Sequence, residues 1–344
     1  MLHPTRAVAL LITLSLSGLA SAAHANPCVA IADDTERLSC YDTLFKRDAS
    51  PAAATPSAAS PPAPDTAALP SSRLSRFWEL GAHEKNGTFR IRTFMPNYVL
   101  PVHHVNRINR NPSTPSQPAP NEDKQYRHTD VKLQLSLRAK MAEGLLLPNA
   151  DLWFAYTQQS LWQLYDSEDS APFRSTDHQP EVIYVLPIPQ ENRPLPFGFD
   201  WRLIKLGFVH QSNGQSDPLS RSWNRVYLAS TVERDDFFMR LRYDYRIPER
   251  AARDDNPDID KFIGNTELRL NWTPGSSVAM MTLKSYLPNT SKGSVQLDWT
   301  HPFSRSNPQG LRWYVQIFSG YGESLLDYNH RHTSVGAGIA LFEF

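Results

Sequence analysis

A histidine and a serine stand two residues apart at the end of an apolar stretch of the chain. The segment 200–212 places apolar side chains at alternate positions from Ile204 to Phe208, and this register continues to His210 and Ser212. Residues two apart in a β-strand share a face, so a strand here puts both polar side chains on its apolar side. A base beside a hydroxyl is the minimum for nucleophilic catalysis. The pair therefore predicts a serine nucleophile, Ser212, and a general base, His210.

An asparagine on the following apolar stretch can complete this pair. Asn224 shares the apolar face of segment 223–232 with Val226 and Leu228, and a loop can fold it back beside His210. There it would orient the imidazole, as the third member of a catalytic triad does. A neutral amide suits such a surface, because an unsolvated carboxylate in an apolar environment costs several kcal/mol.

Each of these three side chains also has a simpler interpretation. Taken singly, His210, Ser212 or Asn224 could be a polar residue at the boundary between membrane and water. Three polar groups aligned on one apolar face favour a site over that alternative. No G-x-S-x-G sequence surrounds Ser212, which disfavours the α/β-hydrolase class of serine hydrolases.

Strands of alternating polarity must position these residues. From Phe77 onward the recurring pattern has a period of two, as in the apolar positions from Val131 to Ala139. The pattern predicts twelve strands, near 84–99, 128–140, 149–164, 180–188, 200–212, 223–232, 237–247, 262–273, 277–286, 293–300, 310–320 and 332–344.

The strand lengths and connections indicate a closed barrel. Most strands have close to the 9–11 residues that a tilted membrane-spanning strand needs, and their number is even. The chain also ends on an aromatic residue, Phe344, as terminal barrel strands often do. We therefore expect an all-β protein, a twelve-stranded antiparallel transmembrane β-barrel with a short N-terminal periplasmic segment. The alternative is a soluble β protein whose sheet has one solvent-exposed face. Long polar connections over 101–127, 165–179, 213–222 and 248–261 alternate with tight ones at 233–236 and 274–277.

Composition excludes two other classes of protein. The 344 residues include 35 Lys and Arg against 35 Asp and Glu, and this zero net charge argues against a nucleic-acid partner. Outside the first 25 residues the unbroken apolar runs reach only five residues, whereas a membrane-spanning helix needs about 20. The mean hydropathy of −0.45 is that of a soluble protein. That average hides the apolar residues of a barrel, because they occupy alternate positions.

The N-terminus predicts export and three short segments before the barrel. Residues 1–25 have a basic start, an apolar core and a small-residue end, which together predict a cleaved signal peptide. Residues 26–48 contain both cysteines, Cys28 and Cys40, and an exported pair is most simply a disulfide. Residues 49–72 are rich in Ala, Pro and Ser and predict a linker. The barrel domain then covers 73–344.

The chain resembles the outer membrane phospholipase A family. The segment HQSNGQSDPLSRSWNR at 210–225 is similar to the active-site segment of that family, which reads H-x-S-N-G followed by S-R-S-W-N-R. The resemblance spans about residues 77–344 and excludes the cysteine segment and the linker. Further matching blocks, in the same order, are YTQQS at 156–160, SAPFR at 170–174, DDNPD at 254–258 and SGYGES at 319–324.

The resemblance implies an activity and the roles of several residues. The family's members hydrolyse acyl esters of phospholipids, as phospholipase A1/A2 and lysophospholipase, with calcium and as homodimers in the bacterial outer membrane. By position, Ser212 resembles the nucleophile, His210 the proton acceptor and Asn224 the residue that orients it. The backbone N–H of Gly214 would lie in the oxyanion hole. The resemblance also places Gln158 at the dimer interface.

The resemblance further implies calcium ligands in three polar connections. These map to Ser170, Gln215, Ser220 and, for a site in the monomer, Asp255. The position of Gln215 is often basic in the family, which is harmless if the ligand is its backbone carbonyl, although calcium affinity could differ. If the first strand rises from the periplasm, these connections lie at the extracellular rim, and Ser212 faces the outer leaflet. Oxygen ligands suit calcium.

Two histidines near the C-terminus have a simpler interpretation than a metal site. His330 and His332 share a strand face, but we expect them to line the lumen or rim rather than hold a metal.

The principal alternative to an enzyme is a non-catalytic porin or structural barrel with a polar rim. A serine hydrolase needs Ser212 and a porin does not.

Overall fold

The computed structural model of the chain describes residues 27–44, 71–120, 124–168, 170–287, 289–304, 306–308 and 310–341. The chain divides into two compact units near residue 67, and each is described by itself. The signal peptide predicted over 1–25, residues 49–70 of the predicted linker and the terminal Phe344 lie outside the described residues.

The first unit is a small helical segment. A turn of 3₁₀ helix, η1 (Pro27–Ala30), precedes the helix α1 (Asp34–Leu44). A disulfide joins Cys28 to Cys40 and so ties η1 to α1. No residue of α1 is buried, as expected for a segment too short to build its own core.

The second unit is a β-barrel with short helices at its connections. Its described helices are α2 (Arg73–Trp78) and α3 (Ile259–Ile263), with 3₁₀ turns η2 (Ala82–Glu84), η3 (Gln190–Asn192), η4 (Pro196–Gly198) and η5 (Ala251–Arg253). Its strands are β1 (Ile91–Thr93), β2 (Asn97–Val105), β3 (Thr129–Ala142), β4 (Asp151–Trp162), β5 (Phe173–Pro187), β6 (Asp200–Ser212), β7 (Ser222–Arg234), β8 (Phe237–Arg246), β9 (Thr266–Trp272), β10 (Val278–Ser285), β11 (Gly293–Pro302), β12 (Arg312–Gly320) and β13 (His332–Leu341).

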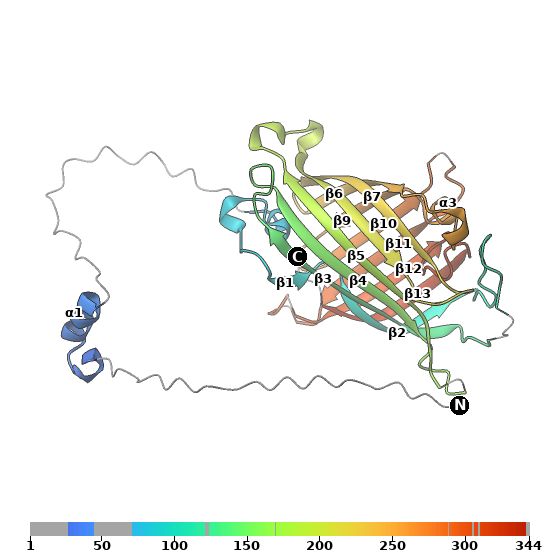
Figure 1. Cartoon of the computed structure of the whole chain (residues 1–344), viewed down its shortest axis with the longest axis horizontal. Coiled ribbons are helices and arrows are strands. Elements are labelled where there is room, and N and C mark those ends of the chain that lie inside the picture. Colours follow the sequence, from blue (N-terminus) through green and yellow to red (C-terminus); the bar gives the residue numbers. More distant parts are fainter. Residues whose placement is uncertain are drawn as a thin grey trace, which may run out of the picture. The chain divides into compact units, whose positions relative to one another are not determined.

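Antiparallel pairing closes the sheet completely. Each strand from β2 to β13 pairs with its sequence neighbours, and β13 pairs back onto β2. The strands run obliquely around the barrel (Figure 1). The twelve-stranded antiparallel barrel predicted from the sequence is therefore confirmed. Closure leaves no free edge among these twelve strands, because each strand from β2 to β13 has a hydrogen-bonded neighbour on both sides.

The first predicted strand is wrong in its position. Alternation predicts one strand over 84–99, but the structure has two pieces, β1 and β2, and η2 occupies the start of that segment. Both pieces pair with β3, with Ile91 opposite Ala139 and Tyr98 opposite Gln134. The break between them contains Pro96, which has no N–H to donate to a sheet. The short β1 is thus an addition to the twelve strands that close the barrel.

The strand β5 begins earlier than the corresponding strand predicted over 180–188. The polar run before residue 180 predicts a loop, but β5 starts at Phe173. The run is polar because its inward side chains meet polar partners in the lumen. Asp177, for example, accepts hydrogen bonds from the Ser175 hydroxyl at 3.0 Å and from the backbone N–H of Leu325 at 2.7 Å. The segment 173–179 therefore extends the barrel wall, with His178 on its outer face.

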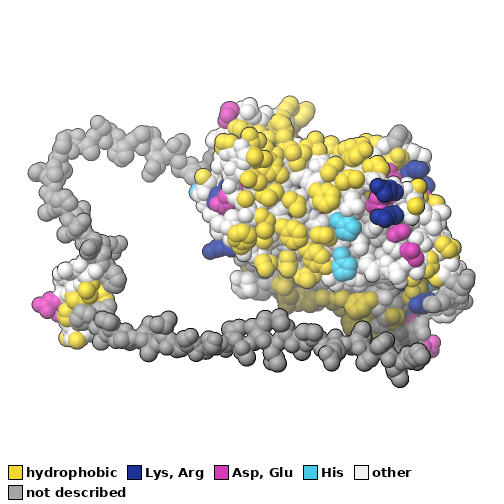
Figure 2. All heavy atoms as spheres, viewed as in Figure 1, with side chains coloured by type: hydrophobic (Ala, Val, Ile, Leu, Met, Phe, Trp, Pro, Cys, Tyr) yellow, Lys and Arg dark blue, Asp and Glu magenta, His cyan; other side chains and the backbone are white. Residues whose placement is uncertain are grey.

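Hydrophobic side chains face outward and charged ones inward. On β8, Leu241 and Tyr243 are exposed, whereas Asp244 is buried. Figure 2 shows the hydrophobic side chains gathered over the barrel wall, with histidines at the boundary of this belt. A belt of this kind is what a barrel presents to lipid. Its exposed members include Leu135, Phe154, Val182, Leu206, Phe208, Val226, Leu228, Leu297, Trp299, Val315, Ile317 and Val335. None of the described helices is long and apolar enough to cross a bilayer.

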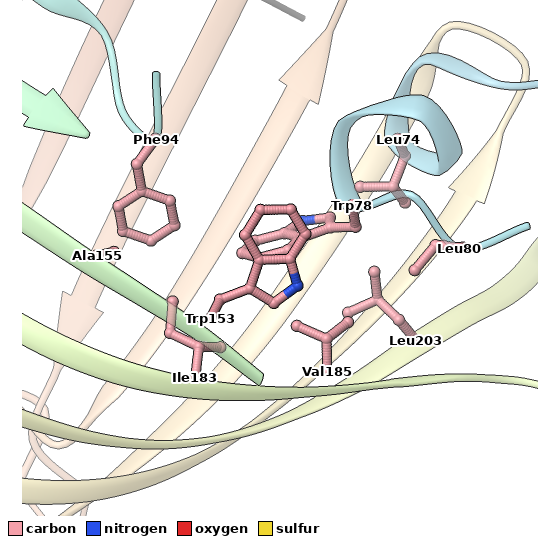
Figure 3. Close-up of a cluster of buried hydrophobic side chains, with 9 residues drawn as sticks. All are labelled: Leu74, Trp78, Leu80, Phe94, Trp153, Ala155, Ile183, Val185 and Leu203. Atoms are coloured by element: carbon pink, nitrogen blue, oxygen red, sulfur yellow. The ribbon is translucent and has the colours of Figure 1, made fainter. Parts of the chain in front are cut away.

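The helix α2 lies inside one end of the barrel. Its Trp78 is only 4% exposed and packs edge-on against Trp153 of β4, with ring centroids 5.8 Å apart (Figure 3). The Lys205 ammonium lies 4.5 Å from the Trp78 ring. The surrounding cluster of buried hydrophobic residues is Leu74, Trp78, Leu80, Phe94, Trp153, Ala155, Ile183, Val185 and Leu203.

The connection 321–331 lies inside the opposite end. Glu323 accepts a hydrogen bond from the Lys132 ammonium at 2.8 Å, and Asp327 accepts one from the Arg174 guanidinium at 2.9 Å. His332 is buried and lies 2.6 Å from the other Glu323 oxygen. His332 therefore lines the packed lumen, and the ring of the partly buried His330 lies beside it, with ring centroids 6.1 Å apart. Both ends of the lumen contain an inserted segment.

The buried ring of Trp78 gives a test of the first insertion. Trp78→Ala should lower the free energy of unfolding of the refolded barrel by about 3–5 kcal/mol, because it leaves a large cavity among the residues of the cluster. Guanidinium unfolding in detergent micelles measures this change. Trp78→Phe keeps most of the ring contacts and should cost clearly less. Equal stability of Trp78→Ala and the wild type would contradict this packing.

Candidate active site

The imidazole of His210 is held by Asn224 across two neighbouring strands. His210 of β6 lies directly opposite Asn224 of β7, and its Nδ1 is 2.9 Å from the Asn224 amide oxygen. The Asn224 amide nitrogen donates to Glu249 at 3.3 Å, which directs the amide oxygen toward the ring. An amide oxygen can only accept, so Nδ1 carries the proton. The lone pair of a neutral ring is then on Nε2, which makes Nε2 the basic atom.

Ser212 follows on the same outer face, at the last position of β6. Its hydroxyl oxygen accepts a hydrogen bond from the backbone N–H of Gly214 at 3.2 Å. Among the described contacts no hydrogen bond joins Ser212 to His210, and such bonds are often absent before substrate binds. The Gly214 N–H is thus beside the predicted nucleophile, where it could donate to an oxyanion. Gly214 has φ of +63°, a left-handed conformation that favours glycine.

The loop after Ser212 is shaped by buried amides. Asn213, only 4% exposed, accepts hydrogen bonds from the backbone N–H groups of Gln215 at 3.3 Å and Arg221 at 2.9 Å. Asn256, which is fully buried, makes two bonds of 3.0 Å to the backbone of Ser222. The Asn213 bonds hold the two ends of the loop 213–221 together, and the Asn256 bonds connect the start of β7 to the connection 247–265. The loop therefore holds Gly214 in a defined place.

Glu249 adds a carboxyl group behind the Asn224 amide. Its pKa is raised, chiefly by partial burial and also by the negative charge of Asp254, although the Arg246 guanidinium and the hydrogen bond from Asn224 act in the opposite direction. Both protonation states of a carboxyl group can accept from the amide. Glu249 therefore supports the orientation of Asn224 over a range of pH.

Some of the predicted calcium ligands are together. The Ser220 hydroxyl donates to the Asp255 carboxylate at 2.6 Å. The amide nitrogen of Gln117 donates to Asp255 at 3.2 Å and to Asp217 at 3.1 Å, so both carboxylates converge on one group. A hydroxyl and two carboxylates are hard oxygen donors of the kind that calcium prefers. The chemistry of this donor set is compatible with calcium, and Asp217 is not among the ligands considered from the sequence.

The other two predicted ligands are not joined to this group. Gln215 donates through its side-chain amide to the backbone carbonyl of Arg174 at 3.5 Å. No described contact links Ser170 to Gln215, Ser220 or Asp255. The described residues also contain no cluster of three or more His, Cys, Asp and Glu that could hold a metal. The roles of Ser170 and Gln215 therefore remain predictions.

Gln158 and His178 extend the polar row beyond Ser212. Gln158 of β4 lies opposite His178 of β5, and His178 lies opposite Ser212 of β6. The Tyr156 hydroxyl contacts Gln158 at 3.2 Å and His178 Nδ1 at 2.7 Å. The Gln158 amide also donates to Ser160 at 3.4 Å. Gln158 is therefore hydrogen-bonded within its own chain, whereas the sequence led us to expect a partner elsewhere.

Sequence reasoning missed His178 because it assigned 165–179 to a loop. The sequence did carry a signal for a strand here. Thr176, His178 and Val182 stand at alternate positions on one face, and Asp177 between them belongs to the inward face. Glu249 had no such signal, because its contact with Asn224 depends on how the connection 247–265 folds.

A family model described as Phospholipase A1 matches residues 74–341 of the chain. A putative phospholipase A1 from Neisseria meningitidis serogroup B is 33% identical over 353 aligned positions, which cover 91% of this chain and 89% of that protein. Phospholipase A1 from Escherichia coli K12 is 37% identical over 222 positions, covering 62% of this chain and 70% of that protein.

Two solved structures are also similar. Outer membrane phospholipase A from Escherichia coli superposes with a TM-score of 0.65 at 32% identity, covering 74% of this chain and 100% of that one. The Salmonella typhi outer membrane phospholipase dimer with bound calcium gives a TM-score of 0.68 at 31% identity, covering 80% of this chain and 99% of that one.

The contact between His210 and Asn224 can be tested without any assay of activity. In Asn224→Ala the acceptor for Nδ1–H is lost, so the His210 ring should no longer be held in one tautomer. Nitrogen-15 NMR of the histidine side chains in micelles should show the two His210 nitrogens moving toward averaged shifts. Leu297→Ala, on the distant β11, is the matched control and should leave them unchanged. His210 shifts that are identical in Asn224→Ala and the wild type would refute the contact.

Proposed function

Because the chain belongs to the phospholipase A1 family, we propose that it hydrolyses acyl ester bonds of phospholipids and lysophospholipids in a bacterial outer membrane. The observation that carries the proposal is the pairing of His210 with Asn224 on the outer, hydrophobic face of the barrel, two residues from Ser212. A lipid ester can reach this face directly from the membrane. The barrel fold and the family are those of outer membrane phospholipases.

The geometry suits hydrolysis through an acyl-enzyme. His210 Nε2 takes the proton of the Ser212 hydroxyl as the oxygen attacks the ester carbon. The same ring then gives that proton to the leaving alcohol, and a water molecule repeats the sequence to release the fatty acid. Asn224 keeps Nδ1 protonated and stabilises the imidazolium without adding a charge. The Gly214 N–H donates to the carbonyl oxygen as it becomes negative.

Calcium is part of the proposal. Ser220, Asp255 and Asp217 would hold the ion, with Gln215 and Ser170 as further ligands suggested by the family resemblance. When bound, calcium supplies positive charge close to the reacting ester. The existing contact of Ser220 with Asp255 supports this placement.

The active form is proposed to be a homodimer that meets at β4. The Gln158 amide donates one N–H to the Ser160 hydroxyl within its chain and retains the other, and its oxygen keeps at least one free lone pair beside the Tyr156 hydroxyl. Two such amides related by a two-fold axis can pair reciprocally. A relative from Salmonella typhi is described as a dimer with bound calcium. The site would face the outer leaflet, since Ser212 ends β6 at the end of the barrel with the long connections.

A porin is the alternative, and the interior argues against it. The lumen contains the α2 cluster at one end and the connection 321–331 at the other. Glu323 and Asp327 of that connection are buried and paired with basic residues of the wall. An open aqueous channel needs an unobstructed lumen.

The nucleophile gives the decisive test of the activity. Purified protein in micelles should release fatty acid from phospholipid when calcium is present and lose this activity when calcium is chelated. Ser212→Ala should lower kcat by several orders of magnitude, because no other group can form the acyl-enzyme. Ser291→Ala, at an exposed serine of the connection between β10 and β11, is the control and should retain full activity. Undiminished release by Ser212→Ala would refute the assignment.

Dimerisation can be tested at Gln158. Cross-linking of the wild type should rise when calcium and a non-hydrolysable acyl amphiphile are added together. Gln158→Leu should weaken the dimer by about 1–2 kcal/mol, the range of a hydrogen-bonded pair in lipid. Leu297→Ala alters the hydrophobic belt on the far side of the barrel and should have no effect. A dimer fraction that is unchanged in Gln158→Leu would exclude this interface.

A further inference from the structure

A second histidine lies on the outer face beside the predicted nucleophile. His178 is directly opposite Ser212 across the β5–β6 pair, so the two side chains are neighbours on the lipid-facing surface. The proposed mechanism uses the side chains of His210 and Asn224 and the backbone N–H of Gly214 around Ser212, and it leaves His178 without a role. An imidazole on this surface loses hydration, so its polar atoms need partners.

One nitrogen of His178 has a partner in the barrel wall. The Tyr156 hydroxyl lies 2.7 Å from Nδ1 and 3.2 Å from the Gln158 amide oxygen. A hydroxyl has one hydrogen to give, and we assign it to Nδ1, because in the proposed dimer the Gln158 oxygen can accept from the second copy of the chain instead. Tyr156 then donates to Nδ1, and the ring proton of neutral His178 is on Nε2. Nε2 is therefore a hydrogen-bond donor.

The other edge of the ring faces the loop that follows Ser212. A methyl group placed on Gly214 would lie 3.8 Å from both Cδ2 and Nε2 of His178. The Gly214 N–H is itself 3.2 Å from the Ser212 hydroxyl oxygen. The two donors, Gly214 N–H and His178 Nε2–H, thus border the nucleophile from the loop and from β5. The described contacts include no hydrogen bond through Nε2 of His178.

We propose that His178 Nε2–H donates a hydrogen bond to a negatively charged oxygen of the substrate during the reaction at Ser212. This inference rests on the proposed phospholipase activity. No proton is transferred by His178, since His210 takes and returns the proton of Ser212. Two oxygens have the required charge, namely the ester oxygen that becomes an oxyanion and the phosphate oxygen of the headgroup. The low polarity of the surrounding lipid strengthens such a bond.

Three substitutions at one position separate this role from a structural one. His178→Gln places an amide N–H near the position of Nε2. His178→Asn places its amide near Nδ1, so it keeps a partner for Tyr156 but cannot reach the substrate. His178→Phe removes both nitrogens and keeps the ring. Folding of each variant is checked by the heat-dependent electrophoretic mobility of the barrel.

Activity is measured on a phospholipid and on a phosphate-free acyl ester, p-nitrophenyl palmitate, in the same micelles with calcium. Both His178→Asn and His178→Phe should lose about 100-fold in kcat, as when one oxyanion donor is removed, while His178→Gln recovers most of the activity. A loss on both substrates identifies the ester oxygen as the acceptor. A loss confined to the phospholipid identifies the phosphate oxygen.

Two results would overturn the inference, and they differ from failure of the proposed function. If His178→Asn and His178→Phe stay within about threefold of the wild type on both substrates, His178 is not a donor to substrate. If His178→Gln is as inactive as His178→Phe, an N–H near the position of Nε2 does not restore activity, and donation to the substrate from this position is excluded. A wild type that hydrolyses neither substrate would refute the phospholipase activity itself, and this inference with it.

Discussion

The structure depends on one constraint, which is that lipid offers no partners for polar groups on the outside of the barrel. Closure of the sheet satisfies the backbone, because β13 pairs with β2 and leaves no free edge. The same constraint applies to side chains. His210 is bonded to Asn224, and His178 is bonded to Tyr156. A reactive group can remain on a hydrophobic surface only when such bonds are present, and these bonds also orient it for chemistry.

The interior has the opposite chemistry and a different purpose. Many charged side chains inside the wall are paired, as Lys132 is with Glu323, and an inserted segment lies in each end of the lumen. These contacts connect the strands on the inner side of the wall, while the outer side remains hydrophobic. The pairing of the strands matters for the site, because Ser212, His210 and Asn224 come from two adjacent strands whose register fixes their spacing.

Much of the fold could be predicted because the two sides of the wall differ so strongly. The strand β6 has the predicted limits of 200–212, since its alternation is unbroken up to Ser212. The prediction failed where polarity had another cause. The start of β5 looks like a loop because Asp177 is polar, and it is polar because the backbone N–H of Leu325 meets it inside the barrel. That partner is far away in the sequence, so no local pattern could reveal it.

The sequence by itself determined the barrel, the outward direction of His210, Ser212 and Asn224, and the resemblance to a lipase family. These follow from a period of two and a contiguous motif, which are local properties of the chain. Only the tertiary structure placed His178 opposite Ser212, Glu249 behind Asn224, and Asp217 beside Asp255. Those placements depend on the register between strands and on how long connections fold over the rim. Register and loop packing are set by contacts between distant residues, because hydrogen bonds and burial act through space.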